Sequence, residues 1–209
     1  MEAKDRYHHG SLRKTLMDAA LDSLEKDGLQ GLSLRKLAES AGVSKTAPYR
    51  HFKDKKELLI NIAADGFGML ADRLAVAGPA DAAPGAEATA EAGHPAVDAG
   101  ADVMRLFRAY IDFARERPAL YKLMFSPLGY SLHSEKCRLN SERALGYLFS
   151  AVGKAQAAGW RSGRETRALG LSIWASVHGW ATLLIDNLLP EWIAGNGDEW
   201  IAHAQALLI

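Results

Sequence analysis

A dense group of hydroxyl, basic and aromatic side chains lies between residues 33 and 56, and this group is well suited to binding a polyanion. The members nearest an expected helix start are small, polar or basic: Lys45, Thr46, Ala47, Tyr49 and Arg50. Small and polar side chains at that place allow close approach to base edges in a DNA major groove. Ser44 and the free N–H groups of the helix start suit a phosphate, as do Lys53, Lys55 and Lys56 just beyond. The chemistry predicted is DNA binding.

The rest of the sequence offers little for catalysis or metal binding. None of the 7 histidines forms a His-x-x-x-His pair, and Cys137 is the single cysteine. There is no phosphate-binding loop and no nucleophile with a base partner. We therefore expect no metal, no cofactor and no enzymatic activity. The alternative is a small all-α enzyme, which would show no salt-dependent binding to DNA. Cys137 is either an inert thiol or a redox sensor without a resolving partner in the chain.

Composition and charge are those of a folded protein of 209 residues, long enough for one larger domain or two small ones. We expect no segment that approaches the ~20 apolar residues of a membrane span, and no signal peptide at the N-terminus. The single cysteine fits a reducing compartment, so a cytoplasmic protein without a membrane partner is expected. Residues 1–56 hold 12 Lys and Arg against 8 Asp and Glu, which makes this part basic.

Apolar residues recur at helical spacing along the chain, in segments that are separated by proline and glycine. The expected helices cover residues 12–28 with Ser11 as N-cap, 34–41 between Ser33 and Gly42, 44–52, and 55–77 after a capping pair of Asp54 and Glu57. Further helices are expected from Asp102 to a break at Pro118, from Leu132 or Ser141 to Ala158, over 165–189, and from about 198. Residues 78–101 are rich in alanine, glycine and proline, which predicts a disordered loop. No segment alternates like a strand, so the predicted fold class is all-α.

A tight turn at residues 41–44, Ala-Gly-Val-Ser, joins two of the short helices and predicts a helix-turn-helix. The first of these helices would turn Leu34, Leu37 and Ala38 toward the core. The second would begin at Ser44 and tolerate Pro48 at the edge of its first turn, where a missing N–H costs little.

This region resembles the TetR family of bacterial regulators over roughly the first third of the chain. The resemblance is carried by residues 32–38 (LSLRKLA), 41–44 (AGVS), 49–55 (YRHFKDK) and 57–59 (ELL), and upstream by residues 7–10 (YHHG) and 19–20 (AA). The sequence departs from the family pattern at Pro48, a position often held by leucine or another apolar residue.

The resemblance implies a role for each matching residue. Ser33 would bind phosphate at the start of its helix, and Arg35 would reach the groove and a guanine. Lys45, Thr46 and Ala47 would contact bases, whereas Tyr49, His51 and Lys55 would mainly bind phosphates. The alternative for His51 is a place near a base, and Phe52 would be core. It also implies a homodimer that binds a double-stranded inverted-repeat operator, usually as a repressor. Residues 1–56 would then form the DNA-binding domain with an N-terminal arm, and 57–209 the effector-binding and dimerisation domain.

The C-terminal part is similar to the family more weakly. Residues 174–179 (WASVHG) resemble a Trp-x-x-x-His-Gly element of one subgroup. The resemblance to the family as a whole implies that the last two long helices of each subunit form a dimer interface, here at about 165–189 and 191–209. Small residues near one face would allow close approach of helices, and a leucine would supply bulk: Ser172, Ala175, Ser176 and Gly179, with Leu184. Aromatic and neighbouring side chains would either line a pocket for an unknown small-molecule effector or form ordinary core: Phe107, Tyr110, Tyr121, Met124, Phe125, Trp174 and His178. An effector-independent DNA-binding protein is the other alternative.

Overall fold

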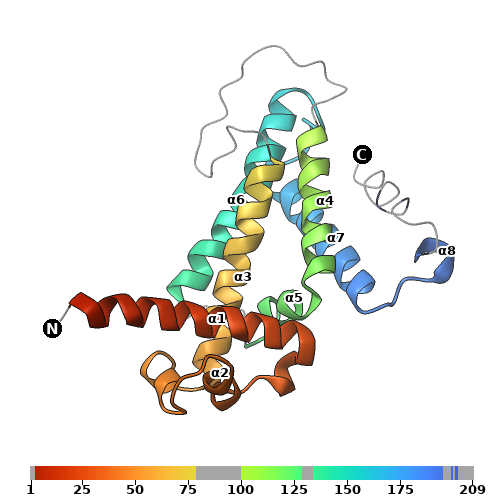
Figure 1. Ribbon diagram of the computed structural model, residues 1–209. Coiled ribbons are helices and arrows are strands. Elements are labelled where there is room, and N and C mark those ends of the chain that lie inside the picture. The colour runs from red at the N-terminus through yellow and green to blue at the C-terminus, as the bar shows by residue number, and fades with distance from the viewer. Residues whose placement is uncertain (1–2, 79–99, 129–133, 195–198, 200, 202–209) are drawn as a thin grey trace. The chain divides into compact units, whose positions relative to one another are not determined.

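The structure is a computed structural model that describes residues 3–78, 100–128, 134–194, 199 and 201. These residues form helices and turns without any strand, which confirms the all-α prediction (Figure 1). The elements in chain order are α1 (Ala3–Gly31), α2 (Leu34–Ser40), the 3₁₀ turn η1 (Ala47–Arg50), α3 (Lys55–Ala77), α4 (Ala101–Glu116), α5 (Pro118–Met124), α6 (Glu135–Ala157), α7 (Thr166–Ile185) and α8 (Glu191–Ala194).

The chain divides into two compact units. One contains residues 1–67 and 117–139, and the other contains residues 68–116 and 140–209. The boundary predicted after residue 56 falls in the first turn of α3, whereas the compact units divide this helix after Phe67. Helix α5 belongs to the same unit as the helix-turn-helix, although it lies far along the chain.

In the first unit, α1 packs against α2 and α5. The apolar stripe of α1 is buried at Leu16, Ala20 and Leu24, as its helical spacing requires. This helix begins at Ala3 rather than after Ser11, so the predicted N-terminal arm is helical. The prediction failed because a serine N-cap contributes only about 1 kcal/mol, which does not force a helix to start there. The predicted stop at Gly28 is a kink, with φ 67° and ψ −173°.

In the second unit, α4 packs along α7 (Figure 1). The predicted apolar face of α4 is buried: Val103, Leu106, Phe107, Tyr110, Ile111 and Phe113. The guanidinium of Arg73 binds both carboxylate oxygens of Glu116 at 2.5 and 2.7 Å, which ties α3 to α4.

The ends of α6 and α7 agree with the prediction only in part. α6 ends before Gly159, which adopts φ 97° as the glycine prediction required, and it begins at Glu135, between the two predicted starts. α7 ends at Ile185, short of the predicted Leu189. It ends there because Asn187 adopts the left-handed conformation, with φ 55°, and Leu188 N–H donates to the carbonyl of Leu183 at 2.9 Å. Most of the predicted 78–101 loop and the predicted helix from about 198 lie outside the described residues.

Candidate nucleic-acid interface

The helix-turn-helix begins with α2, whose two ends are formed as the sequence predicts. Ser33 is its N-cap in extended conformation, and its hydroxyl makes no capping hydrogen bond to the helix. At the other end Gly42 adopts φ 66°, and Val43 N–H bonds the carbonyl of Ala38 at 3.0 Å. Only glycine enters that conformation without strain, so the turn requires it. Leu34, Leu37 and Ala38 are buried, which confirms the inward face.

The segment after the turn differs from the prediction. Instead of an α-helix over 44–52, the structure has a 3₁₀ turn of four residues, Ala47–Arg50, whose N-cap is Thr46 rather than Ser44. Proline explains the difference, because an α-helix capped by Ser44 needs an N–H at residue 48, and Pro48 has none. Pro48 and Phe52 are buried and anchor the turn to the core.

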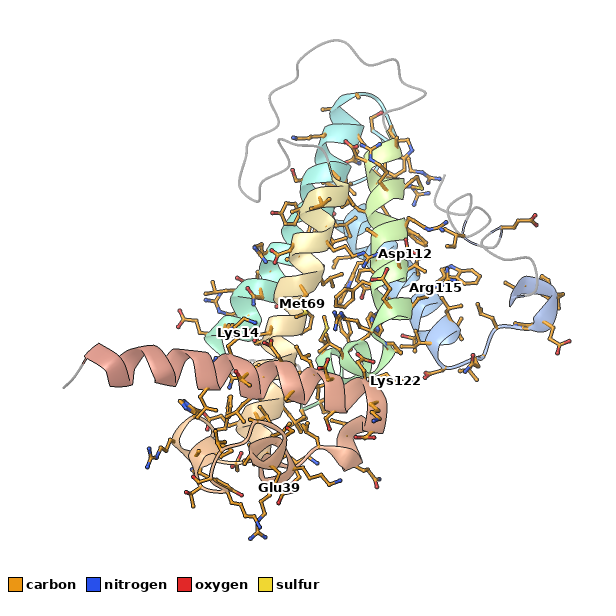
Figure 2. All side chains as sticks on the ribbon, in the orientation of Figure 1. Lys14, Glu39, Met69, Asp112, Arg115 and Lys122 are labelled. Atoms are coloured by element: carbon orange, nitrogen blue, oxygen red, sulfur yellow. The ribbon has the colours of Figure 1, made fainter. Side chains whose placement is uncertain are left out.

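The predicted DNA-contacting residues all belong to this unit and lie on α2, the turn, η1 and the start of α3, with none of their side chains fully buried. Six are exposed: Arg35, Ser44, Lys45, Thr46, Tyr49 and Arg50. The other four are half-buried: Ser33, Ala47, His51 and Lys55. Figure 2 shows side chains, including the labelled Glu39, extending from the part of α2 that lies away from α1. The arrangement is an exposed polar and cationic surface on a rigid apolar base.

Several of these polar groups also contact the protein itself. Lys45 Nζ lies 3.7 Å from the Glu39 carboxylate, and both side chains are well exposed. The hydroxyls of Ser44 and Thr46 are 3.2 Å apart. Lys55 donates to the carbonyl of Leu29 at 2.6 Å, near the end of α1. An ammonium has three N–H donors, so this bond leaves two for phosphate.

Two supporting residues were missed by the sequence reasoning. The guanidinium carbon of Arg13 lies 5.3 Å from the centre of the Phe52 ring, and the same group donates to Asn61 Oδ1 at 2.7 Å. Asn61 in turn donates to the carbonyl of Glu57 at 2.9 Å. Arg13 therefore links α1 to the end of the 3₁₀ turn and to α3. A single arginine on a helix carries no local signal of such partners.

The predicted capping pair at the start of α3 is confirmed. Glu57 N–H donates to Asp54 Oδ1 at 2.8 Å, and Lys53 N–H donates to the Glu57 carboxylate at 2.7 Å. These two bonds fix the backbone that carries the lysines at 53, 55 and 56.

The candidate effector residues fall in both compact units. In the second unit Phe107 is buried, and the Tyr110 hydroxyl lies 3.0 Å from His178 Nδ1, with Trp174 beside that imidazole at a ring distance of 6.2 Å. Burial lowers the pKa of His178. In the first unit Tyr121 and Met124 are buried and Phe125 is half-buried, and the Phe125 ring packs against Phe67 at 5.3 Å.

Helix α7 exposes the face proposed for dimerisation. Ser172 and Ala175 are exposed, and Ser176, Gly179 and Leu184 are half-buried. An 18-residue window of this helix has a mean hydropathy of 1.4, with 28% of it buried, so α7 is long and apolar enough to cross a membrane by length and composition. This corrects the expectation that no segment approaches such a length. The helix nevertheless packs along α4, and its buried residues include Leu169, Ile173, Val177 and Ala181.

Comparison with known proteins explains both parts of the chain. Residues 16–62 match the family described as bacterial regulatory proteins, tetR family, and residues 103–207 match the tetracyclin repressor-like C-terminal domain. The chain belongs to the TetR family. It is therefore a helix-turn-helix transcriptional regulator that binds DNA, in a family that is not enzymatic.

Individual relatives of this TetR-family chain are similar over different lengths. The tetracycline repressor class A from transposon 1721 of Escherichia coli is 49% identical over 49 residues, 23% of each protein, so the match spans about a quarter of that repressor. A structure of a protein with unknown function from Rhodococcus sp. RHA1 is 33% identical, with 97% of this chain and 95% of that one covered and a TM-score of 0.75. FadR from Bacillus subtilis in complex with stearoyl-CoA is 15% identical, with 93% and 95% covered and a TM-score of 0.61.

Proposed function

We propose that this regulator is a cytoplasmic, ligand-responsive repressor that binds an inverted-repeat operator as a homodimer. The observation that carries the operator proposal is the exposed side-chain group on α2 and the following turn. Arg35, Lys45 and Arg50 project from a surface whose interior is fixed by buried Pro48 and Phe52. A rigid base with exposed cations and hydroxyls fits readout of a major groove with phosphates on each side.

Dimerisation is supported by the exposed apolar face of α7. Leu171 and Leu183 are 43% and 39% exposed, beside small residues at Ser172 and Ala175. A helix this apolar gains free energy when a second surface covers it, and small side chains let that surface approach closely. A second copy of the chain is the proposed occupant. Membership of the TetR family supports the same assignment, because the family's fold implies a dimer interface formed by the last two long helices of each subunit.

An effector is supported by the polar pair within the second unit. Tyr110 and His178 form a polar contact among buried aromatic and aliphatic groups, the kind of feature that orients a small ligand. The FadR relative, whose structure holds stearoyl-CoA, supports a small-molecule effector but not its identity.

A second candidate is a DNA-binding regulator without an effector. Phe107 in the second unit and Tyr121 and Met124 in the first are each at most 2% exposed, which fits two cores that are each filled by their own side chains. The two candidates differ in ligand response. A panel of acyl-CoAs and drug-like compounds should raise the melting temperature and weaken operator binding if the first is correct, and should do neither if the second is.

The operator proposal is tested by selection from a random DNA pool. We expect an enriched inverted repeat with half-sites roughly one helical turn apart or somewhat more, and a complex containing an even number of chains. Enrichment of a motif without two-fold symmetry, or a free protein with the mass of one chain, would contradict the homodimer.

A further inference from the structure

Pro48 lies at the position where an α-helix capped by Ser44 would make its first hydrogen bond. In such a helix the N–H of residue 48 would donate to the carbonyl of Ser44. Proline has no N–H, so this bond is absent whatever the surrounding sequence favours. The helix would have to start without the bond that closes its first turn, which is the costly step of helix formation.

The structure shows a different set of bonds around Pro48. Ala47 N–H donates to the carbonyl of Ser44 at 2.9 Å, and Tyr49 N–H donates to that of Thr46 at 3.2 Å, both with the three-residue spacing of a 3₁₀ helix. The carbonyl of Pro48 accepts from His51 and Phe52, each at 3.0 Å. Pro48 is also buried. It therefore both prevents the α-helical start and anchors the turn that replaces it.

The 3₁₀ form changes which side chains share a face. With 3.0 residues per turn, Thr46 and Tyr49 are stacked in one direction, and Arg50 points about 120° away from Thr46. With 3.6 residues per turn, Thr46 and Arg50 would be only about 40° apart. The bond from Tyr49 N–H to the carbonyl of Thr46 gives this pair the 3₁₀ spacing, and the side chains of Thr46 and Tyr49 are both exposed, as is that of Arg50.

We propose that Pro48 is a specificity-determining positioning residue, which holds the recognition segment in 3₁₀ form so that Thr46 and Tyr49 together face one base step. Arg50 then lies beside the groove and binds phosphate. This inference depends on the proposed operator binding and deepens it. It assigns Tyr49 to a base step, where the resemblance alone implies a phosphate.

The test is to compare the DNA motif selected by the wild type with that selected by Pro48→Leu. Leucine refills a buried apolar position and restores the N–H, so the variant can form the α-helical start. We expect a changed motif at one symmetric position of each half-site and about 10-fold weaker binding to the wild-type operator, because one misread base pair has an effect of that order. Binding to random DNA should be unchanged. Pro48→Ala, which restores the same N–H with a smaller side chain, should shift the motif in the same direction.

Two further sets of variants sharpen the result. In the wild-type background, Thr46→Ala and Tyr49→Ala should each lose base preference at the same position of the selected motif. Arg50→Ala should weaken binding to all DNA sequences equally. In the Pro48→Leu background, Arg50→Ala should instead alter base preference. Pro118→Ala, at the first position of α5, is the matched control and should leave the motif unchanged.

The outcomes separate the possible failures. An identical motif and equal operator affinity for wild type and both Pro48 variants would overturn the role of Pro48. An equal loss on operator and random DNA would also overturn it, since Pro48 would then only support the fold. A wild-type protein that enriches no motif would overturn operator binding itself, and the readout role of Pro48 with it.

Discussion

The Tyr110 hydroxyl on α4 and Nδ1 of His178 on α7 lie 3.0 Å apart, and they join the two helices that pack along each other in the second unit. His178 is half-buried, and its ring lies beside Trp174. Because burial disfavours the charged imidazolium, it lowers the pKa of His178 below its ordinary value of 6.5. The neutral imidazole is therefore the form that the folded protein favours.

The lowered pKa of His178 predicts a stability that depends on pH. In the window just below pH 6.5 the unfolded chain binds a proton at this position more readily than the folded chain does. The contribution of His178 to the free energy of unfolding is therefore fully present above pH 6.5, and it is lost as the pH falls through the pKa that His178 has in the folded protein. Urea unfolding of wild type and His178→Gln at fixed protein concentration should show a smaller loss between pH 8 and pH 5 in the variant.

A comparison with Tyr110→Phe separates titration from hydrogen bonding. This variant should be about 1 kcal/mol less stable than wild type at pH 8, because it loses one hydrogen bond. It should keep the fall in stability toward acid. An identical pH profile for wild type and His178→Gln would show that His178 titrates alike in both states.

Glu25 on α1 should stabilise the fold through the first turn of α5. Its carboxylate accepts the N–H groups of Ala119 at 3.1 Å and Leu120 at 3.0 Å, just after Pro118. These N–H groups have no partner within the helix, so the carboxylate satisfies them and balances the positive end of the helix dipole. Glu25→Ala should lower the free energy of unfolding by about 1–3 kcal/mol.

Urea unfolding with a matched surface variant would test this expectation. Asp18→Ala removes an exposed ion pair with Lys14 on the same helix and should change stability by less than about 0.5 kcal/mol. Glu25→Gln, which keeps one acceptor oxygen, should recover part of the loss. Equal stability of Glu25→Ala and Asp18→Ala would mean that water replaces the carboxylate without cost.

Lys55 should contribute both to folding and to DNA binding, whereas Lys53 should contribute to DNA binding alone. Lys55 donates to the carbonyl of Leu29 at 2.6 Å, and the side chain of Lys53 is exposed. Lys55→Ala should lower the melting temperature, reduce affinity on all DNA sequences and flatten the salt slope by about one per subunit. Lys53→Ala should affect affinity and slope but leave the melting temperature unchanged. An unaltered slope in Lys55→Ala would assign this lysine to the fold only.

Gly179 offers a clean test of the α7 dimer face. A Cβ added at Gly179 would meet nothing within 4 Å in a single chain, and the position is half-buried, so we expect Gly179→Arg to fold. In a close helix pair the same arginine would clash or bury an unpaired charge, so light scattering should find one chain per particle. Gly153→Arg, on α6 and equally open in a single chain, is the control and should remain dimeric. If Gly179→Arg is still dimeric, the dimer interface does not include this face of α7.

The sequence predicted those parts of the fold that depend on neighbouring residues. Gly42 and Gly159 mark helix ends because a left-handed residue there is a local requirement, and Asp54 with Glu57 marks a start for the same reason. The buried faces of α2 and α4 followed from apolar spacing alone. Tolerance of Pro48 in the first helical turn was a wrong inference, because that rule holds only where the N–H is not yet needed.

Features that join distant residues had no such signal. Glu25 and Leu120 are 95 positions apart, and nothing local to either residue indicates the other. The same is true of Arg13 over the ring of Phe52. The sequence identified the exposed cations of the candidate interface by residue type, but not the bond between Lys55 and Leu29 that gives one of them a second role.

Arg35 provides the sharpest test of base readout outside the 3₁₀ turn. It is exposed on α2, so its replacement should change stability by less than about 0.5 kcal/mol, and effects on DNA binding can be assigned to the contact itself. A guanidinium matches O6 and N7 of guanine with two parallel hydrogen bonds, which discriminate by about 1–3 kcal/mol. Arg35→Ala should therefore relax selection for a G·C pair at one symmetric position of each half-site.

Arg35→Lys should relax this selection as well while keeping the wild-type salt slope, because lysine retains the charge but not the paired donors. Lys36→Ala, at the adjacent exposed position, should leave the motif intact. If selection from a random pool gives all four proteins the same motif, Arg35 binds phosphate or serves the fold.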